Sequence, residues 1–237
     1  MSESDVTASR ADHGLDVAAL FVALQRINER PALYSRYTAD ALWTSPDISE
    51  MLLRFHLDGE VDVASRRTDF IEASVDWMVA AFELGPGYDL ALMIMWDYCA
   101  LSPSQRRRLL ERVGQMLAPG GAFLFDVYSL SAFETWEEQV AYGPGLMDGF
   151  WSARPYHGFL NTFRYEAEKV VLEKYTIVEA AGTREYLNWF QHYDVAGLTA
   201  EVEAAGLTVS AVHGDVAGAP FEASAPEFCV VVERPGA

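Results

Sequence analysis

The sequence has few basic residues, and this shortage excludes one class of partner. Lysine and arginine together number 17, against 35 aspartate and glutamate residues, so the formal net charge is −18. Nucleic-acid binding needs lysine and arginine clustered against phosphates. The one basic run, Arg106–Arg108, is predicted to lie on the solvated face of a helix. We therefore expect no nucleic-acid partner.

Cysteines and long apolar runs are also scarce. Cys99 and Cys229 are the only cysteines, and each lies in an apolar, strand-like run, which favours buried thiols over a disulfide or a metal site. No run reaches the roughly 18 uncharged apolar residues of a membrane-spanning helix. The first 13 residues are polar and acidic, without an apolar signal core. A cytoplasmic protein without a membrane partner is expected.

Several short catalytic motifs are missing as well. The sequence contains no HExxH, paired CxxC, phosphate-binding P-loop or GxSxG pattern. Metalloprotease, zinc-ribbon, nucleotide-hydrolase and serine-hydrolase functions have no support, and no metal site is expected.

The strongest positive signal is a strand, a helix and a second strand within Tyr88–Ser129. Asp89–Met95 and Ala122–Val127 are almost unbroken apolar runs, as in strands buried on both faces of a parallel sheet. Ser102-Pro103 is typical of a helix start. One apolar helix face follows, made of Leu109, Leu110, Val113, Met116 and Leu117. A crossover of this length predicts two parallel strands joined in the right-handed sense.

Three helices are predicted before this unit and an antiparallel insertion after it. The helices are expected at Leu15–Ile27, from Ser45-Pro46-Asp47 onward, and at Thr68–Phe82, with an aromatic-rich loop at Ala32–Thr44. Leu130–Gln139 is expected to be helical and Gly143–Gly149 a turn region. Period-two patterns then predict strands at Phe159–Tyr165, Lys169–Glu179 and Thr183–Tyr193, with a turn at Ala181-Gly182. A helix at Val195–Ala205 and strands at Leu207–His213 and Phe228–Glu233 end the chain.

The central unit, YDLAL…DYCALSPSQRRRLLERVGQMLAPGGAFLFDV, resembles the fourth strand, following helix and fifth strand of class I S-adenosylmethionine-dependent methyltransferases. The resemblance extends over about four fifths of the chain, to a bacterial small-molecule type of this family. The matching segments elsewhere are Arg30–Tyr34, Ala64–Arg66, Phe150–Ser152, Asn188-Trp189 and Gly214–Gly218. It implies a Rossmann-like α/β fold, methyl transfer to a small molecule, and S-adenosylmethionine as the cofactor.

One segment of the family's pattern is absent from the sequence. The first strands, the glycine-rich cofactor loop and a ribose-binding acid belong between Leu84 and Tyr88, where only Gly85-Pro86-Gly87 stands. That segment needs about 60 residues, because one βαβ unit takes about 30. We expect a truncated sheet: residues 1–84 as a tail and helical cap, and residues 85–237 as the α/β core, with the insertion at about 150–193. The open edge at residues 88–96 invites a second copy or a partner subunit.

Ligands of open α/β sheets bind outside the carboxyl ends of the strands. The resemblance places Asp97, Tyr98 and Cys99 beside the methionine end of the cofactor. For Asp97, ligand contact and a structural role as a helix cap or buried acid are equally supported. For Asp126, which ends the second strand, a structural role is favoured.

An acceptor site is predicted where the cap and the insertion meet, because aromatic residues are dense in both. The predicted substrate-binding residues are Tyr34, His56, Arg66, Trp151, Asn188, Trp189 and Tyr193. Arg66 would offer a positive charge to a substrate carboxylate. If the acceptor must lose a proton, the candidate bases are His192, His56 and His157, with His192 the preferred catalytic residue. For each, an ordinary hydrogen-bonded histidine or core packing is the alternative.

Three hypotheses about function stay open. The first is a small-molecule methyltransferase. The second is a degenerate, non-catalytic binding protein or partner subunit that kept the cap and the pocket. The third is an internally deleted form of an ordinary enzyme. Binding of the cofactor would separate the first from the other two.

Overall fold

The structure, a computed structural model, describes residues 16–60, 65–82 and 90–235, and the chain divides into two compact units, Met1–Arg30 and Pro31–Ala237. In the first unit, helix α1 (Val17–Ile27) forms where the apolar spacing predicts it. Asp16 caps this helix, because its carboxylate accepts a hydrogen bond from the backbone N of Ala19 at 3.0 Å. All elements below belong to the second unit.

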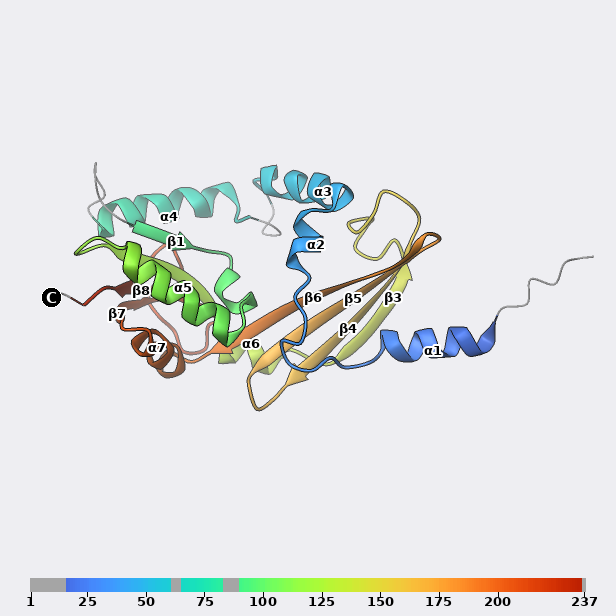
Figure 1. Ribbon diagram of the computed structural model, residues 1–237. Helices are drawn as coiled ribbons and strands as arrows, with labels where there is room; N and C mark the ends of the chain where they lie inside the picture. The colour runs from blue at the N-terminus through green and yellow to red at the C-terminus, as the bar shows by residue number, and fades with distance from the viewer. Residues whose placement is uncertain (1–15, 61–64, 83–89, 236–237) are drawn as a thin grey trace, which may run out of the picture. The chain divides into compact units, whose positions relative to one another are not determined.

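The central unit has the predicted strand–helix–strand order and parallel pairing (Figure 1). Strand β1 (Leu90–Met93) runs parallel to β2 (Ala122–Ser129), with Leu90 opposite Ala122 and Met93 opposite Phe125. Helix α5 (Pro103–Met116) connects them. The predicted Gly85-Pro86-Gly87 turn and the residues around it lie outside the described residues.

Helix α5 begins with a reciprocal capping box. The Ser102 hydroxyl accepts a hydrogen bond from the Gln105 backbone N at 3.4 Å, and Gln105 Oε1 accepts one from the Ser102 backbone N at 2.8 Å. We expect Ser102→Ala to lower the free energy of unfolding by about 1 kcal/mol. Urea denaturation would measure this against Gln115→Ala, a change at an exposed position of the same helix. Equal losses in the two variants would contradict the role of the cap.

Helices cover both faces of the sheet around β2. Strand β8 (Glu227–Glu233) pairs antiparallel with β2, and β7 (Thr208–His213) pairs antiparallel with β8. Side chains alternate along β2: Phe123, Phe125 and Val127 pack with α5 and α7 (Val195–Ala204), whereas Ala122 and Leu124 pack with α4 (Thr68–Ala81). The fold is therefore mixed α/β, as the sequence predicts.

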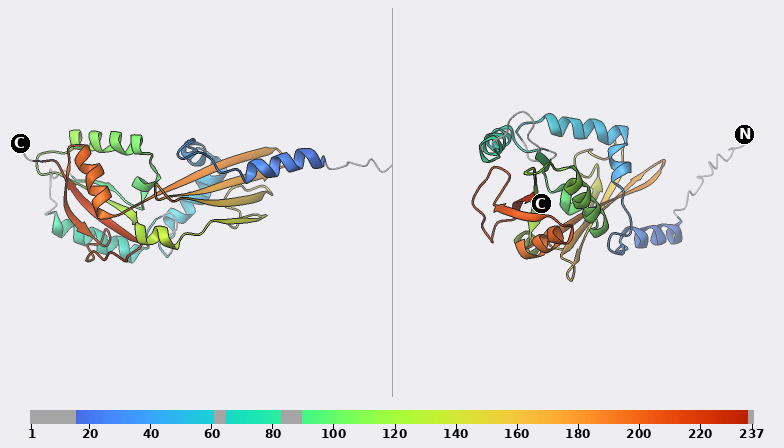
Figure 2. Two further views of the ribbon diagram at one scale, coloured as in Figure 1. Left: turned by 90° about the horizontal axis from the view of Figure 1, so that it is seen from below. Right: turned by 60° about the vertical axis from the view of Figure 1, so that its left-hand side comes forward.

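The antiparallel insertion has one more strand than the sequence predicts. Strands β4 (His157–Tyr165), β5 (Val170–Glu179) and β6 (Gly182–Tyr193) confirm the three predicted ones. The helix predicted to reach Gln139 ends at Thr135 (α6, Leu130–Thr135), and Gln139–Pro144 forms β3 along β4. Pairing with a distant strand thus overrides the local helical pattern. Figure 2 shows β3–β6 side by side.

The turn between β5 and β6 also differs from the prediction by one residue. Glu179 is opposite Gly182, so Ala180 and Ala181 form the turn instead of Ala181 and Gly182. Moving a two-residue turn by one position changes every cross-strand partner by two residues. Glu173 is consequently opposite Asn188, and not opposite Phe190 as the predicted turn would place it.

Two helices of the predicted cap lie against the insertion. Helix α2 (Ala39–Trp43) lies inside the segment that the sequence predicts to be a loop. The pattern does not reveal this helix, because five residues are too few to show a helical period. Helix α3 (Pro46–Leu57) starts at the predicted proline. Its residue Ile48 is fully buried in a cluster with aromatic residues of the insertion, namely Phe150, Trp151, Tyr156, Tyr175 and Tyr186.

Residues 31–38, which we call the edge segment, lie along β6. Strand β6 pairs with β5 on one side, but with β2 only at His192 and Tyr193. On that second side, the backbone N of Leu187 donates to Thr38 Oγ1 at 2.8 Å, and the indole of Trp189 donates to the Arg36 carbonyl at 3.1 Å. The edge segment thus covers part of the edge of β6.

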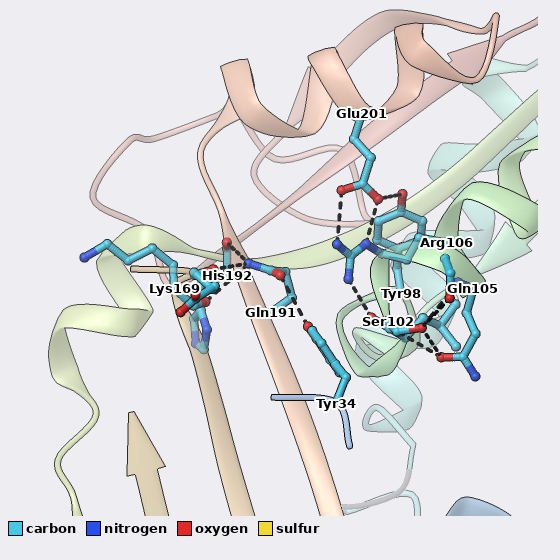
Figure 3. Close-up of polar contacts among 12 residues, drawn as sticks. Tyr34, Tyr98, Ser102, Gln105, Arg106, Lys169, Gln191, His192 and Glu201 are labelled. Carbon is cyan, nitrogen blue, oxygen red and sulfur yellow. Dashed lines mark hydrogen bonds and ion pairs between the residues drawn. The ribbon is translucent and has the colours of Figure 1, made fainter. Parts of the chain in front are cut away.

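Arg106 does not lie on a solvated helix face, which corrects the prediction for the first residue of the basic run. It is 3% exposed, and its Nε and Nη2 donate to the two carboxylate oxygens of Glu201 at 2.6 and 3.2 Å (Figure 3). The same carboxylate accepts a hydrogen bond from the Tyr98 hydroxyl at 2.7 Å. The first turn of α5 faces α7 here, whereas Arg107 and Arg108 are exposed as predicted.

Three expected absences can be compared with the described residues. Cys99 and Cys229 are buried free thiols, as predicted. Within residues 16–60, 65–82 and 90–235, no histidine, cysteine and carboxylate side chains are grouped so as to hold a metal ion. No helix in these ranges is both long and apolar enough to cross a membrane.

Candidate functional site

The carboxyl end of β1 has an unusual backbone. Met95 and Trp96 both adopt left-handed conformations, with φ of 68° and 60°, which cost free energy in residues other than glycine. The carboxylate of Asp126, within β2, accepts a hydrogen bond from each of their backbone amides, at 3.2 and 2.9 Å. Asp126 is 1% exposed, and burial raises its pKa to about 6. It is the buried structural acid that the sequence favours.

Arg66 and Glu227 complete this turn. Arg66 Nη2 lies 2.6 Å from Glu227 Oε2 and 3.9 Å from Asp126 Oδ2, and its guanidinium is 4.3 Å from the centre of the Trp96 ring. The Trp96 indole also donates to Glu227 at 2.5 Å. The Arg66 charge is therefore paired within the chain. A substrate carboxylate would have to compete with Glu227 for it.

The three residues after the turn differ in accessibility. The side chain of Asp97 is exposed to solvent, although the protein around it removes part of its hydration and so raises its pKa. The cap of α5 is Ser102, so Asp97 has neither of the structural roles weighed for it. Tyr98 and Cys99 are fully buried: Tyr98 donates to Glu201, and the Cys99 sulfur accepts a hydrogen bond from the backbone N of Tyr128 at 3.3 Å. Of the three predicted cofactor contacts, Asp97 alone has an accessible side chain.

A cavity of about 370 Å³ lies between α2–α3, the 147–151 loop and the insertion. Two predicted substrate-binding residues, Trp151 and Asn188, line it. The other lining residues are mostly apolar: Leu42, Met51, Leu52, Phe55, Met147, Asp148, Phe150 and Tyr175. The Trp151 indole nitrogen is buried and has no hydrogen-bond partner among the described residues. A predominantly apolar cavity with a few polar groups is the usual form of a small-molecule site.

One face of β6 connects the strand tips to this cavity. His192 is opposite Tyr128 at the tip of β2, and Asn188 lines the cavity. Phe190 lies between them on the same face, because side chains alternate along a strand. Its ring contacts Tyr128 at a centroid distance of 6.0 Å, and Tyr128 stacks on Trp96 at 4.7 Å.

The remaining predicted substrate-binding residues do not line the cavity. Trp189 and Tyr193 lie on the opposite face of β6; Trp189 packs with Leu33 and Tyr34, and Tyr193 packs in the core near Arg106. The Tyr34 hydroxyl donates to Gln191 at 3.3 Å (Figure 3). The alternation of side chains along β6 separates Trp189 and Tyr193 from Asn188, and the sequence alone is enough to predict this separation. His56 is exposed on α3, with Nδ1 2.8 Å from the Leu52 carbonyl oxygen.

His192 is a weak base in this environment. It is 2% exposed and packs against the rings of Tyr128 and Phe133, at centroid distances of 5.5 and 5.3 Å. Burial lowers its pKa to about 4, because the imidazolium form loses its hydration. His157, the third candidate base, is exposed at the start of β4 and is absent from the lining of the cavity.

Glu173 and Tyr175 are polar residues near the cavity that the sequence reasoning missed. Glu173 is directly opposite Asn188 across β5 and β6, and its carboxylate accepts a hydrogen bond from the Tyr175 hydroxyl at 3.0 Å. Burial raises the pKa of Glu173. The period-two pattern of β5 places both residues on one face. The partner of Glu173 on β6 depends on the β5–β6 turn, which the sequence analysis predicts one residue too late.

The described residues supply only part of the cofactor site that the sequence resemblance implies. Among the described residues, β1 is the first strand and pairs with β2 alone. In residues 16–60 and 65–82, only helices and connecting segments precede it, so no strand–glycine loop–helix is present there to hold a nucleotide. The strand tips around Trp96 and Asp97 remain, but these residues do not fit a complete S-adenosylmethionine site.

No family model matches the sequence, and no curated protein matches it. Three matching solved structures illustrate what the chain is similar to. The CcbJ methyltransferase from Streptomyces caelestis is 16% identical with a TM-score of 0.46, over 65% of this chain and 61% of that chain. An S-adenosylmethionine-dependent methyltransferase from Clostridium acetobutylicum ATCC 824 is 9% identical with a TM-score of 0.46, over 73% and 74%. The sugar N-methyltransferase KedS8 from Streptoalloteichus sp ATCC 53650 is 17% identical with a TM-score of 0.38, over 65% and 60%. At such identities and TM-scores, none of these likenesses assigns the chain to a family.

Proposed function

We propose that this chain is a methyltransferase-like protein that binds a small organic molecule in the cavity between α2–α3 and the insertion. The observation that carries the proposal is the single face of β6 that leads from the strand tips to the cavity, through His192, Phe190 and Asn188. In an open α/β sheet the reactive group of a ligand is expected at the strand tips. The sequence resemblance of Tyr88–Ser129 names the reaction as methyl transfer from S-adenosylmethionine.

Methyl transfer demands little acid–base chemistry from the protein. Alignment of the nucleophile with the methyl group supplies most of the rate increase. A buried aromatic face next to the strand tips suits this role, because it excludes water and orients an acceptor. His192, with its low pKa, is better suited to shaping that face than to removing a proton at neutral pH.

A second function, a non-catalytic binding protein or partner subunit, is favoured by one observation. Strand β1 has no strand on its outer side among the described residues, and Leu92 in it is 48% exposed. A second copy or another chain could pair there and supply the missing half of the cofactor site.

The cytoplasmic location expected from composition stays a prediction.

Calorimetric titration with S-adenosylhomocysteine separates the two functions. If the chain alone binds the cofactor, we expect a dissociation constant in the micromolar range, about −8 kcal/mol. Asp97→Asn should then weaken binding, whereas Glu111→Gln, at an exposed position of α5, should not. No heat and no thermal stabilisation at millimolar ligand would exclude the active-enzyme hypothesis for the chain alone.

A further inference from the structure

Three polar residues form a row across the insertion. Thr162 on β4 is directly opposite Glu173 on β5, which is directly opposite Asn188 on β6. Directly opposed residues of antiparallel strands share a face of the sheet. Asn188 lines the cavity, so all three lie on the face that bears it. This polar row interrupts a surface that is otherwise rich in aromatic rings.

The carboxylate of Glu173 has no cationic partner among the described residues. The carboxylate accepts a hydrogen bond from the hydroxyl of Tyr175, a residue that lines the cavity. The other glutamates of these strands differ: Glu179 pairs with Arg184 at 3.2 Å, and Glu185 pairs with Arg36 and Lys174 at 2.8 and 3.3 Å. A half-buried carboxylate without a counter-charge is costly unless something else compensates it.

Two further polar groups, on Thr162 opposite Glu173 and on Trp151 beside Tyr175, are buried and lack partners among the described residues. Thr162 is 2% exposed and Trp151 is 1% exposed; the Thr162 hydroxyl and the Trp151 indole nitrogen form no hydrogen bond within the parts of the chain that the structure describes. Buried polar atoms are nearly always paired in folded proteins. The rings of Trp151 and Tyr175 lie 4.7 Å apart beside the same cavity. Aromatic faces next to a carboxylate favour a cation.

We propose that Glu173, which lies on the same sheet face next to the lining residues Tyr175 and Asn188, anchors a cationic group of the ligand, an ammonium or a guanidinium, at the border of the cavity. The inference rests on the proposed binding function and adds the charge of the ligand. Glu173 lies opposite Asn188. Along β6, Asn188 is two residues before Phe190 and four residues before His192. The anchored cation is thus separated along β6 from the strand tips, so it positions the ligand, and Glu173 is a specificity-determining residue. The net charge of −18 attracts cations in the same sense.

Paired probes of equal size test the charge preference without knowledge of the natural ligand. We would titrate the full chain by calorimetry with 2-phenylethylammonium and 2-phenylethanol, which differ in charge but scarcely in volume. The ammonium should bind about tenfold more tightly, since an ion pair in a partly buried site adds more than a neutral hydrogen bond. Glu173→Gln should abolish that preference and leave binding of the alcohol unchanged. Glu166→Gln, an exposed change at the β4–β5 turn, should preserve it.

Several results would overturn the inference. The first is equal affinity of the two probes for the unmodified protein. The second is no binding of the ammonium at 10 mM, a concentration about tenfold above a millimolar dissociation constant. The third is a preference for the ammonium that survives Glu173→Gln. The comparison of the two probes on the unmodified protein needs no variant, so an unstable Glu173→Gln does not affect it. Neither probe is a cofactor analogue. Failure of S-adenosylhomocysteine to bind would reject methyl transfer by the chain alone and leave the result for the cation standing.

Discussion

Glu201→Ala should lower the free energy of unfolding by about 3–5 kcal/mol. The change removes the carboxylate that holds Arg106, which is 3% exposed and forms no ion pair with another carboxylate in residues 16–60, 65–82 and 90–235. It also leaves the buried Tyr98 hydroxyl without its acceptor. The cost comes chiefly from an unpaired charge in the interior between α5 and α7, and it should appear as a lower midpoint in urea denaturation.

Two comparisons make this prediction specific. Glu203→Ala removes an exposed carboxylate two residues further along α7 and should change stability by less than about 0.5 kcal/mol. The double variant Arg106→Met/Glu201→Leu removes both charges and should recover most of the stability that Glu201→Ala loses, because apolar replacement of a buried ion pair is often close to neutral. If the double variant were as unstable as Glu201→Ala, the unpaired charge would not be the cause.

The second large effect is a pair of opposed pH dependences at His192 and Asp126. Burial lowers the pKa of His192 from 6.5 to about 4, so below pH 6.5 the unfolded chain binds a proton that the folded chain refuses. Stability from this group is complete above pH 6.5 and is lost as the pH falls towards 4. At about 1.4 kcal/mol for each pKa unit, the full loss is about 3 kcal/mol.

Asp126 acts in the opposite direction over nearly the same range. Burial raises its pKa from 3.8 to about 6, so between these values the folded chain binds the extra proton. Stability from this group is complete below about pH 4 and is lost as the pH rises through 6. The loss is again about 3 kcal/mol, so the two groups largely cancel in the unmodified protein.

Single variants should expose the two slopes. Asp126→Asn keeps His192, and its stability should fall more steeply than that of the unmodified protein between pH 6.5 and 4. His192→Gln keeps Asp126, and its stability should fall less over the same interval or rise. Urea denaturation at half-unit pH intervals measures both, and the slopes decide the outcome whatever the absolute stabilities are.

A matched control is the exposed histidine on α3. His56→Gln should leave the slope unchanged, because it replaces an exposed side chain and keeps the buried His192 and Asp126 in place. Parallel curves for His192→Gln and His56→Gln would contradict the burial argument for His192.

Local signals predicted most of the fold. The crossover from β1 to β2, the start of α5 at Ser102 and the three long strands of the insertion each depend on a pattern within about 15 residues, which a periodicity reading can detect. Strand β3 and the burial of Arg106 depend on partners far along the chain: β4 for the strand, and Glu201, 95 residues away, for the arginine. No local pattern carries that information.

The candidate site was predictable in part for the same reason. Aromatic density pointed to Trp151, and the resemblance of Asn188-Trp189 to the family pointed to Asn188; both line the cavity. Strict use of the strand alternation would also have separated Asn188 from Trp189 and Tyr193. Glu173 needed the register of β5 and β6, and a one-residue error in the turn moves its partner from Asn188 to Phe190.

The edge segment has a consequence for how the chain reaches its folded state. The edge segment contacts β6 through the hydrogen bond between Thr38 and Leu187, and these two residues are 149 positions apart in the sequence. Contacts of such long separation form late, because a large loop must close first. Until then, the edge of β6 is open to strands of other nascent chains. We therefore expect residues 31–38 to end, on docking, the period in which the folding protein can misassemble through this edge.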